Sequence, residues 1–239
     1  MLTKSEVKYI QSLYYKKNRD AEKLFIAEGV KLVEELLLSD FKIKKIYALK
    51  NWINLHDKIK NVTEISEPEL KKISNFETPN KVLAIVQQKN STHIPPLKNK
   101  ITILLDGIQD PGNLGTIVRT ADWFGIENII ASNDTADVYN PKVVQSTMGS
   151  IARVNIFYTD LKTFLSSNKI IVYGAVLDGE NISTIKKQKE CLLIIGNESK
   201  GIRDDIHPYI QKRISIPKTG NAESLNAAVA AGIILFSLK

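Results

Sequence analysis

The sequence predicts an α/β protein in two parts, a small α/β domain over residues 1–88 and a larger domain over residues 100–239. In the larger part, apolar strand-like runs alternate with helix-like segments, which is typical of a parallel sheet with helices on both faces. The run over residues 101–105 is apolar except for one threonine, as in a strand buried on both faces. Between the parts, the Pro95-Pro96 pair and the absence of apolar periodicity predict a linker over residues 89–99.

The first part alternates short helix-like and strand-like segments. Apolar residues three and four positions apart predict helices over residues 5–17 and 30–38. Another helix is expected after Ser66, because Ser66 and Glu69 have the spacing of a capping box. Short apolar runs predict strands over residues 24–26, 43–49 and 82–86.

The second part opens with the strand over residues 101–105, a loop that carries glycines, and a helix over residues 116–124. Further helices are expected to begin at Asn140-Pro141 and at Asp160, which suit helix N-termini. A closing helix over residues 224–238 is rich in small side chains. Strand-like runs cover residues 129–130, 154–157, 170–176, 192–195 and 214–216.

Composition excludes several classes of protein. The chain has 239 residues, 43% apolar and 25% charged, with one cysteine and three histidines. Cys191 alone can form neither an internal disulfide nor a cysteine-based zinc site, and the histidines lie far apart, so we expect no metal. The longest apolar run, about residues 227–236, is shorter than the ~20 residues of a membrane span. Charges close to the N-terminus disfavour a secretory signal, so a cytoplasmic protein without a membrane partner is expected.

The net charge of +7 is concentrated in the first part. Residues 1–99 carry 18 Lys and Arg against 12 Asp and Glu, whereas residues 100–239 carry 15 against 14. A basic module followed by a nearly neutral one indicates that the first docks a polyanion. The alternative is a lysine-rich solvated surface without a partner.

Three loops follow strand ends, where ligands gather in parallel α/β sheets. The first covers residues 106–119 and carries Gly107, Gly112 and Gly115, with Asn113 and Arg119 near its junction with the helix. Its glycine spacing does not match the dinucleotide-binding pattern, and the loop could equally be a simple turn.

The second and third loops are also ambiguous when each is considered alone. Residues 196–201 read Gly-Asn-Glu-Ser-Lys-Gly, and could either surround a polar ligand or simply connect a strand to a helix. Residues 216–226 lead into the closing helix, where Ser224 is a plausible N-cap. Asn226 would be an unfavourable residue inside the first turn, which indicates a polar partner for its side chain.

Together, and in this order, the three loops resemble the SpoU (TrmH-like) family of SPOUT RNA methyltransferases. The resemblance rests on three motifs, which are Asn113-Leu-Gly-Thr-Ile-Val-Arg119, Gly196-Asn-Glu198-Ser-Lys-Gly201, and Ile216-Pro with Gly220 and Ser224-Leu225-Asn226. The basic first part is similar to the RNA substrate-binding domain that often precedes the catalytic domain. The resemblance implies an α/β domain whose C-terminal segment forms a trefoil knot.

The resemblance further implies transfer of a methyl group from S-adenosylmethionine to a ribose 2′-hydroxyl of structured RNA, with ribosomal RNA favoured over transfer RNA. The implied catalytic residues are Arg119, Asn113, Glu198, Ser224 and Asn226. Those implied to bind the cofactor are Gly196, Ile216, Leu225 and Ala175. A homodimer through the knotted region is also implied, using the small-residue face of the last helix.

The scarcity of His and Cys fits this chemistry, because an in-line methyl transfer gains most from positioning. The base that takes the hydroxyl proton stays open. Arg119 could serve, or its always-protonated guanidinium could orient the hydroxyl and stabilise the developing oxyanion. The alternatives are the same chemistry on transfer RNA, a non-catalytic RNA-binding or ribosome-assembly protein, and, more distantly, a nicotinamide-dependent oxidoreductase.

Overall fold

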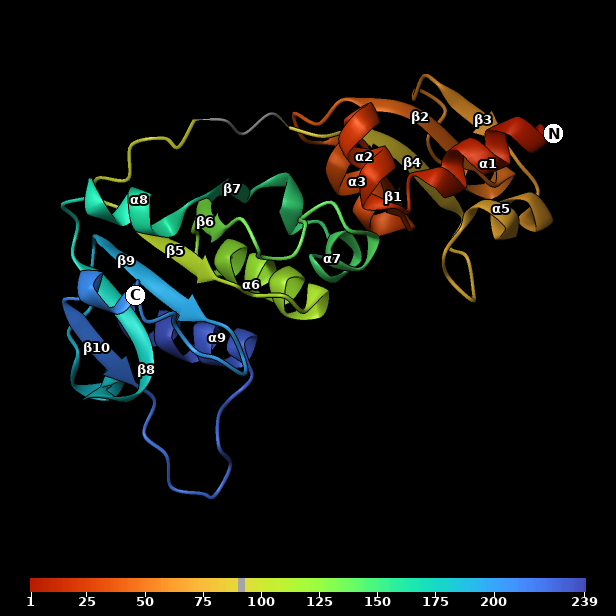
Figure 1. Cartoon of the computed structure of the whole chain (residues 1–239). Helices are drawn as coiled ribbons and strands as arrows, with labels where there is room; N and C mark the ends of the chain where they lie inside the picture. Colours follow the sequence, from red (N-terminus) through yellow and green to blue (C-terminus); the bar gives the residue numbers. More distant parts are fainter. Residues whose placement is uncertain (90–92) are drawn as a thin grey trace. The chain divides into compact units, whose positions relative to one another are not determined.

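The computed structural model describes residues 1–89 and 93–239 and divides the chain into two compact units (Figure 1). Unit 1 comprises residues 1–90 and 139–152, and unit 2 comprises residues 91–138 and 153–239. Residues 139–152 were expected within the 100–239 domain, but they pack with unit 1. The predicted linker over residues 89–99 lies partly outside the described residues.

Unit 1 contains a four-stranded mixed sheet in the order β1-β4-β2-β3. Its strands are β1 (Leu24–Glu28), β2 (Ile43–Ala48), β3 (Val62–Glu64) and β4 (Val82–Gln87). Its helices are α1 (Lys4–Ser12), α2 (Lys16–Glu22), α3 (Val30–Leu37), α4 (Lys50–Ile53), α5 (Glu67–Ile73) and α7 (Pro141–Ser146). The predicted strands and the small α/β character are confirmed, whereas α4 and β3 were not anticipated.

The single helix predicted over residues 5–17 is wrong, because the chain forms α1 and α2 with a break between them. Tyr15 adopts an extended backbone and precedes α2. The buried Arg19 supplies the physical reason, since its Nη1 donates to the carbonyls of Leu13 at 3.2 Å and Tyr14 at 2.8 Å. Carbonyls at a helix end need partners outside the helix, and this arginine provides them.

Two helix starts in this unit follow from the sequence. At α5, Glu69 Oε2 accepts hydrogen bonds from the backbone N–H of Ser66 at 2.9 Å and from its hydroxyl at 2.8 Å. The N–H of Ser66, the N–H of Leu2 and then the Ser66 hydroxyl lower the pKa of Glu69 to about 2. At α7, Asn140 Oδ1 accepts from the N–H of Lys142 at 2.9 Å, as its capping residue type predicts.

Unit 2 contains a six-stranded sheet in the order β10-β8-β9-β5-β6-β7, and every neighbouring pair is parallel. The strands are β5 (Ile101–Asp106), β6 (Asn128–Ser132), β7 (Asn155–Thr159), β8 (Val172–Asn181), β9 (Cys191–Gly196) and β10 (Lys212–Ser215). The α-helices are α6 (Pro111–Trp123), α8 (Leu161–Ser166) and α9 (Ala227–Leu238). The predicted parallel sheet is confirmed.

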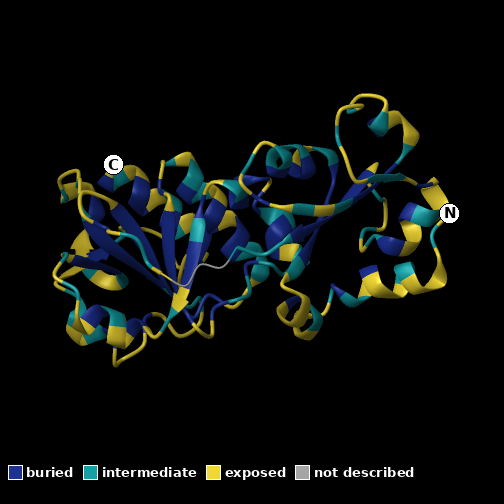
Figure 2. Ribbon diagram, turned by 90° about the horizontal axis from the view of Figure 1, so that it is seen from above, coloured by how far each residue is buried: buried dark blue, intermediate teal, exposed yellow. Residues whose placement is uncertain are grey.

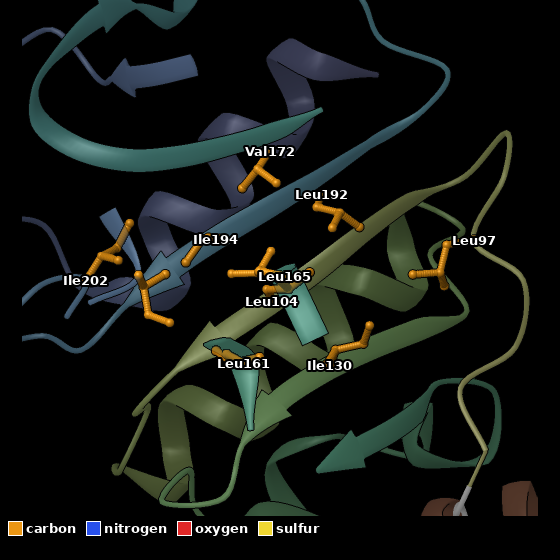
Figure 3. Packing of buried hydrophobic residues seen from close by; sticks show 10 residues of the cluster. Leu97, Leu104, Ile130, Leu161, Leu165, Val172, Leu192, Ile194 and Ile202 are labelled. Carbon is orange, nitrogen blue, oxygen red and sulfur yellow. The ribbon is translucent and has the colours of Figure 1, made fainter. Parts of the chain in front are cut away.

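The core of unit 2 lies on both faces of this sheet. On one face, Leu161 and Leu165 of α8 pack with Leu104, Ile130 and Leu192, and this cluster is labelled in Figure 3. α9 contacts β9 and lies against α6. The central strands β5, β6 and β9 are almost entirely buried, as Figure 2 shows. The cysteine at the start of β9, Cys191, is inside this core, where burial and then Glu190 raise its pKa to about 12.

Two helix boundaries in unit 2 differ from the prediction, and both matter for the motifs. The helix predicted over residues 116–124 begins earlier, because Asp110 caps α6 by accepting from the N–H of Asn113 at 2.8 Å. Asn113 therefore lies in the first turn of the helix. The closing helix begins later than expected, because Asn226 rather than Ser224 is its N-cap. Asn226 Oδ1 accepts from the N–H groups of Ala228 at 3.0 Å and Val229 at 3.3 Å.

Candidate active site

A large cavity opens where β8 separates from its neighbours. β8 pairs with β9 only through Val172, Tyr173 and Gly174. Its pairing with β10 jumps from Gly174 to Glu180, so that residues 175–179 leave the ladder. The resulting cavity of about 1010 Å³ lies at the carboxyl ends of the strands, where parallel sheets bind ligands.

The cavity walls combine the second and third sequence motifs. All four residues predicted to bind a cofactor line it, which are Ala175, Gly196, Ile216 and Leu225. Glu198 and Ser224, predicted as catalytic residues, line it as well. Apolar and polar side chains from β8, β9, α9 and the two loops supply the remaining surface. A cavity of this size with both apolar walls and polar groups suits a small organic cofactor.

A chain of amide and carboxylate groups joins all three motifs. Asn226 Nδ2 donates to Asn113 Oδ1 at 2.8 Å, and Asn113 Nδ2 donates to Glu198 Oε1 at 2.6 Å. Asn113 lies in the first turn of α6, Glu198 follows β9, and Asn226 caps α9. Two hydrogen bonds thus join Asn113 to Glu198, 85 positions away in the sequence, and to Asn226, 113 positions away. The side-chain oxygen of Asn226 caps α9, and its side-chain nitrogen donates to Asn113. Asn113 is therefore the polar partner that the sequence led us to expect for Asn226.

Arg119 and Ser224 do not join this chain. Arg119 is exposed on α6, six residues after Asn113, which puts the two side chains about 120° apart around the helix. Ser224 is exposed in the loop before α9. Among the described contacts, neither side chain has a hydrogen bond or ion pair. The structure therefore brings Asn113, Glu198 and Asn226 together and leaves Arg119 accessible to a ligand.

An ion pair between a buried carboxylate and a half-exposed arginine links the start of the first loop to the segment after the second loop. The Asp106 side chain at the end of β5 is fully buried, and its Oδ1 lies 2.6 Å from Nη2 of Arg203. Its Oδ2 accepts from the backbone N–H of Arg203 at 2.8 Å. Partial burial alone would lower the pKa of Arg203, but Asp106, with Asp134 and Asp205, raises it above its ordinary value. Asn197 adds a second link, with Nδ2 donating to the carbonyl of Gly107 at 2.7 Å.

Asp106, Asn197 and Arg203 were not among the predicted site residues. Asp106 occupies the last position of an apolar strand, and Arg203 is one of only five arginines. The sequence gives no other sign that Asp106 and Arg203 matter, and neither of these two features indicates that their side chains form a pair. These residues act through contacts between distant parts of the sequence. The hydrogen bond from the Arg203 N–H to Asp106, for example, joins residues 97 positions apart.

Asp106→Ala is expected to lower the free energy of unfolding by about 1.5–3 kcal/mol, because it removes a buried carboxylate together with its hydrogen bond and its ion pair to Arg203. The matched control is Asp134→Ala. Asp134 is half exposed and lies 3.8 Å from Arg203, so its loss should cost less than about 1 kcal/mol. Urea unfolding of both variants measures the difference. Equal losses would contradict the assigned role of the buried Asp106 carboxylate.

The described residues show neither a metal centre nor a membrane span. Across residues 1–89 and 93–239, no three His, Cys, Asp or Glu side chains come together as a metal ion would require. Within the same residues, no helix combines the length and apolar character needed to cross a membrane.

Comparison with known proteins identifies two families along the chain. Residues 100–236 match the SpoU rRNA Methylase family, and residues 4–84 match the MRM3-like substrate binding domain. The chain is 32% identical over 244 residues to a Bacillus subtilis 23S rRNA (guanosine(2553)-2′-O)-methyltransferase, RlmP, covering 98% of this chain and 96% of that protein.

Solved structures agree with this relationship. An AdoMet-bound rRNA methyltransferase from Sinorhizobium meliloti superposes with a TM-score of 0.89 at 33% identity, covering 100% of this chain and 95% of the other. A TrmH-family structure from Porphyromonas gingivalis gives 0.89 at 34% identity, covering 100% and 98%. The fold and the three assembled motifs define an α/β protein of the methyltransferase class. The chain belongs to the SpoU rRNA methylase family.

Proposed function

We propose that this protein transfers a methyl group from S-adenosylmethionine to a ribose 2′-hydroxyl of ribosomal RNA. The observation that carries the proposal is the Asn226–Asn113–Glu198 hydrogen-bond chain, which assembles the three motifs beside the large cavity. The full-length similarity to a 23S rRNA 2′-O-methyltransferase supports the choice of RNA and of the hydroxyl. Action on ribosomal RNA would place the protein in the cytoplasm.

The cavity residues fit the cofactor. Ala175, Gly196, Ile216 and Leu225 would hold it, with backbone groups of the second and third loops as hydrogen-bond partners. When bound, S-adenosylmethionine supplies an electrophilic methyl group. Arg213 and Asp178 form an ion pair of 2.6 Å at the cavity, and the Arg213 hydrogen bond holds the pKa of Asp178 below its usual range. These charged groups are among the polar contacts that the cavity offers a ligand.

The protein's own residues would then position the RNA. Asn113 and Asn226 fix each other, and Glu198 holds the amide of Asn113, so that the three act as one rigid unit. Arg119, exposed on α6, would hold a backbone phosphate through its guanidinium and stabilise the negative charge that develops on the ribose oxygen. Ser224, exposed in the loop before α9, would contact the nucleotide. Holding the ribose oxygen in line is expected to supply most of the rate enhancement.

Mapping 2′-O-methyl groups in ribosomal and transfer RNA, with and without the gene, tests this function. The proposal expects one ribosomal 2′-O-methyl group to disappear with the gene and to return on treatment of the unmodified RNA with purified protein and S-adenosylmethionine. Loss of a transfer RNA methyl group instead would assign the same chemistry to the other substrate. Unchanged methylation of both would favour a non-catalytic RNA-binding protein.

Unit 1 is the proposed RNA-docking part, because it carries most of the net positive charge. Replacing four exposed lysines of this unit, Lys8, Lys17, Lys31 and Lys72, by Gln should flatten the salt dependence of RNA binding, by about 0.7–0.9 in slope for each lysine that binds a phosphate. A filter-binding titration with 23S rRNA at several salt concentrations measures the slope. Substitution is preferable to removal of residues 1–88, because α7 packs on β1.

The matched control replaces four exposed lysines of unit 2, Lys169, Lys186, Lys187 and Lys189, by Gln. It removes the same charge from the chain. If both quadruple variants flatten the slope equally, the docking role of unit 1 is refuted and only the total charge matters.

A homodimer through α9 is the proposed assembly. The small residues Ala227, Ala228 and Ala231 are buried within the chain, which differs from the expectation that they face a partner. The exposed α9 face consists instead of Val229, Ile233 and Phe236, which are 50%, 38% and 75% exposed and spaced as one stripe. An apolar stripe of this size on a helix surface is suited to burial by a second copy. The expected trefoil knot stays a prediction, compatible with the return of the chain after β10 to pack α9 on β9.

Ile233→Glu is expected to convert the dimer to a monomer, because it places a charge at the centre of the α9 face. Light scattering after size exclusion measures the mass. Leu55→Glu is the control, since Leu55 is 80% exposed in unit 1, outside this face. A monomeric parent protein, or a variant that stays dimeric, would contradict the interface.

A further inference from the structure

Unit 1 contains a second cavity that the proposed methyl-transfer site does not use. Its volume is about 280 Å³, and it lies between β1, the segment after α5, and α7. The residues that matter for its chemistry are Glu28, Leu32, Asn75, Phe76, Val144 and Gln145. This volume is below the ~300–1,000 Å³ typical of drug-sized ligands, so the cavity suits a single small ring system.

The polar end of this cavity is a buried carboxylate held by neutral donors. Glu28 is 6% exposed, and its Oε1 accepts from the hydroxyl of Tyr14 at 2.6 Å and from the N–H of Asn75 at 3.2 Å. Its Oε2 accepts from the hydroxyl of Ser74. A carboxylate can accept about four hydrogen bonds, so one acceptor position on Oε2 is left. Burial and then the charge of Glu28 raise the pKa of Tyr14, which keeps this phenol protonated as a donor.

The other walls provide a ring, two amides and aliphatic surface. Leu32 and Val144 are 4% and 1% exposed and line the cavity, while the Phe76 side chain is half-buried beside them. Asn75 and Gln145 supply side-chain amides from different elements, since one follows α5 and the other belongs to α7. Proteins recognise unstacked RNA bases with these groups, by contact with an aromatic ring and hydrogen bonds from amides and carboxylates to the base edge.

The charges around this cavity of unit 1 indicate which part of an RNA could enter it. Unit 1 is basic overall and would attract a polyanion, and Lys142 also lines this cavity. The carboxylate of Glu28 would nevertheless repel a phosphate that came close to it. A neutral ring that presents an N–H group to Glu28 avoids that repulsion and completes the set of hydrogen bonds on the carboxylate. The nucleobases carry such groups on a planar ring.

We propose that the cavity lined by Glu28, Phe76 and Gln145 is a nucleobase pocket, which takes up one unstacked base of the RNA substrate. Phe76 contacts the face of the base, Glu28 accepts an N–H group from its edge, and Gln145 supplies a further hydrogen bond. The inference rests on the proposed function, because it requires RNA as the substrate. It gives unit 1 a means of recognising a particular structure in the RNA, beyond attraction to phosphates.

The test compares Phe76→Leu and Gln145→Ala with the parent full-length chain, using a 23S rRNA transcript as the probe. Removal of the stacking between base and aromatic ring is expected to weaken RNA binding by about 5- to 100-fold. The slope of log affinity against log salt should stay unchanged, because the variants keep every Lys and Arg of the chain and the slope reports the phosphates that such cations neutralise. Methyl transfer should show a raised KM for RNA with an unchanged kcat, and Phe76→Tyr should restore binding. Phe164→Leu, a half-buried aromatic residue on α8, is the matched control.

The idea is overturned if Phe76→Leu and Gln145→Ala, each with the parent's melting temperature, bind the transcript as tightly as the Phe164→Leu control. It is also overturned if affinity falls together with the salt slope, since that result would assign a phosphate contact. A parent protein that methylates ribosomal RNA while these variants bind normally refutes the pocket alone. A parent that neither binds nor methylates RNA refutes the proposed function and the pocket together.

Discussion

Replacing Arg119 by Ala is expected to lower the rate of methyl transfer to RNA by at least about 100-fold, as removal of a donor that stabilises a developing oxyanion does in other enzymes. Binding of S-adenosylmethionine should be largely unchanged, because Arg119 is absent from the residues that line the large cavity. The free energy of unfolding should change by less than about 0.5 kcal/mol, since the side chain is exposed on α6. A labelled-methyl assay measures the rate of methyl transfer, and a calorimetric titration measures the binding of S-adenosylmethionine separately.

Arg119→Lys distinguishes the two roles considered for this residue. A lysine keeps the positive charge but loses the planar fork that can hold a phosphate through two hydrogen bonds. If Arg119 acts through charge and position, Arg119→Lys should recover part of the lost rate, and RNA affinity should fall less than in Arg119→Ala. Retained turnover in Arg119→Ala would remove the residue from the mechanism.

The position of Arg119 also shows why sequence spacing alone could not define the site. Asn113 and Arg119 belong to one motif, yet the helix turns them to different sides because six residues are one and two-thirds turns. Asn113 and Asn226 lie 113 residues apart and are directly hydrogen-bonded. Motif membership therefore predicted which residue types matter, whereas the contacts among them depend on the packing of α6 against α9.

Local rules predicted much of the fold. The apolar β5 and β9, the Asn140 and Asp160 caps, and the Ser66–Glu69 pair follow from short-range chemistry and were all predicted. The predictions fail where a distant side chain decides the outcome. Arg19 takes up the carbonyls at the end of α1, so the helix predicted over residues 5–17 is broken in two. This contact leaves no periodic signal in the sequence.

Gly196→Ala is expected to abolish binding of S-adenosylmethionine and to lower the free energy of unfolding by about 1–3 kcal/mol, the usual cost of overpacking. A Cβ at this position would lie 2.4 Å from the carbonyl carbon of Gly201 and 2.5 Å from the nitrogen of Ile202. These are backbone atoms, held by reciprocal hydrogen bonds of 2.9 Å between Asn197 and Gly201. These backbone atoms cannot move aside as a flexible side chain could. The second loop must therefore open to make room for the added Cβ.

Gly220→Ala is the matched control for this change. Gly220 lies in the third loop and also lines the large cavity, but an added Cβ there has no described atom within 4 Å and its φ is not left-handed. It should therefore keep the parent's stability and cofactor affinity. Thermal unfolding with and without S-adenosylmethionine measures both quantities, because a ligand that binds the folded state raises the melting temperature. A ligand-induced shift that survives in Gly196→Ala would contradict the role of this close backbone contact in shaping the cofactor site.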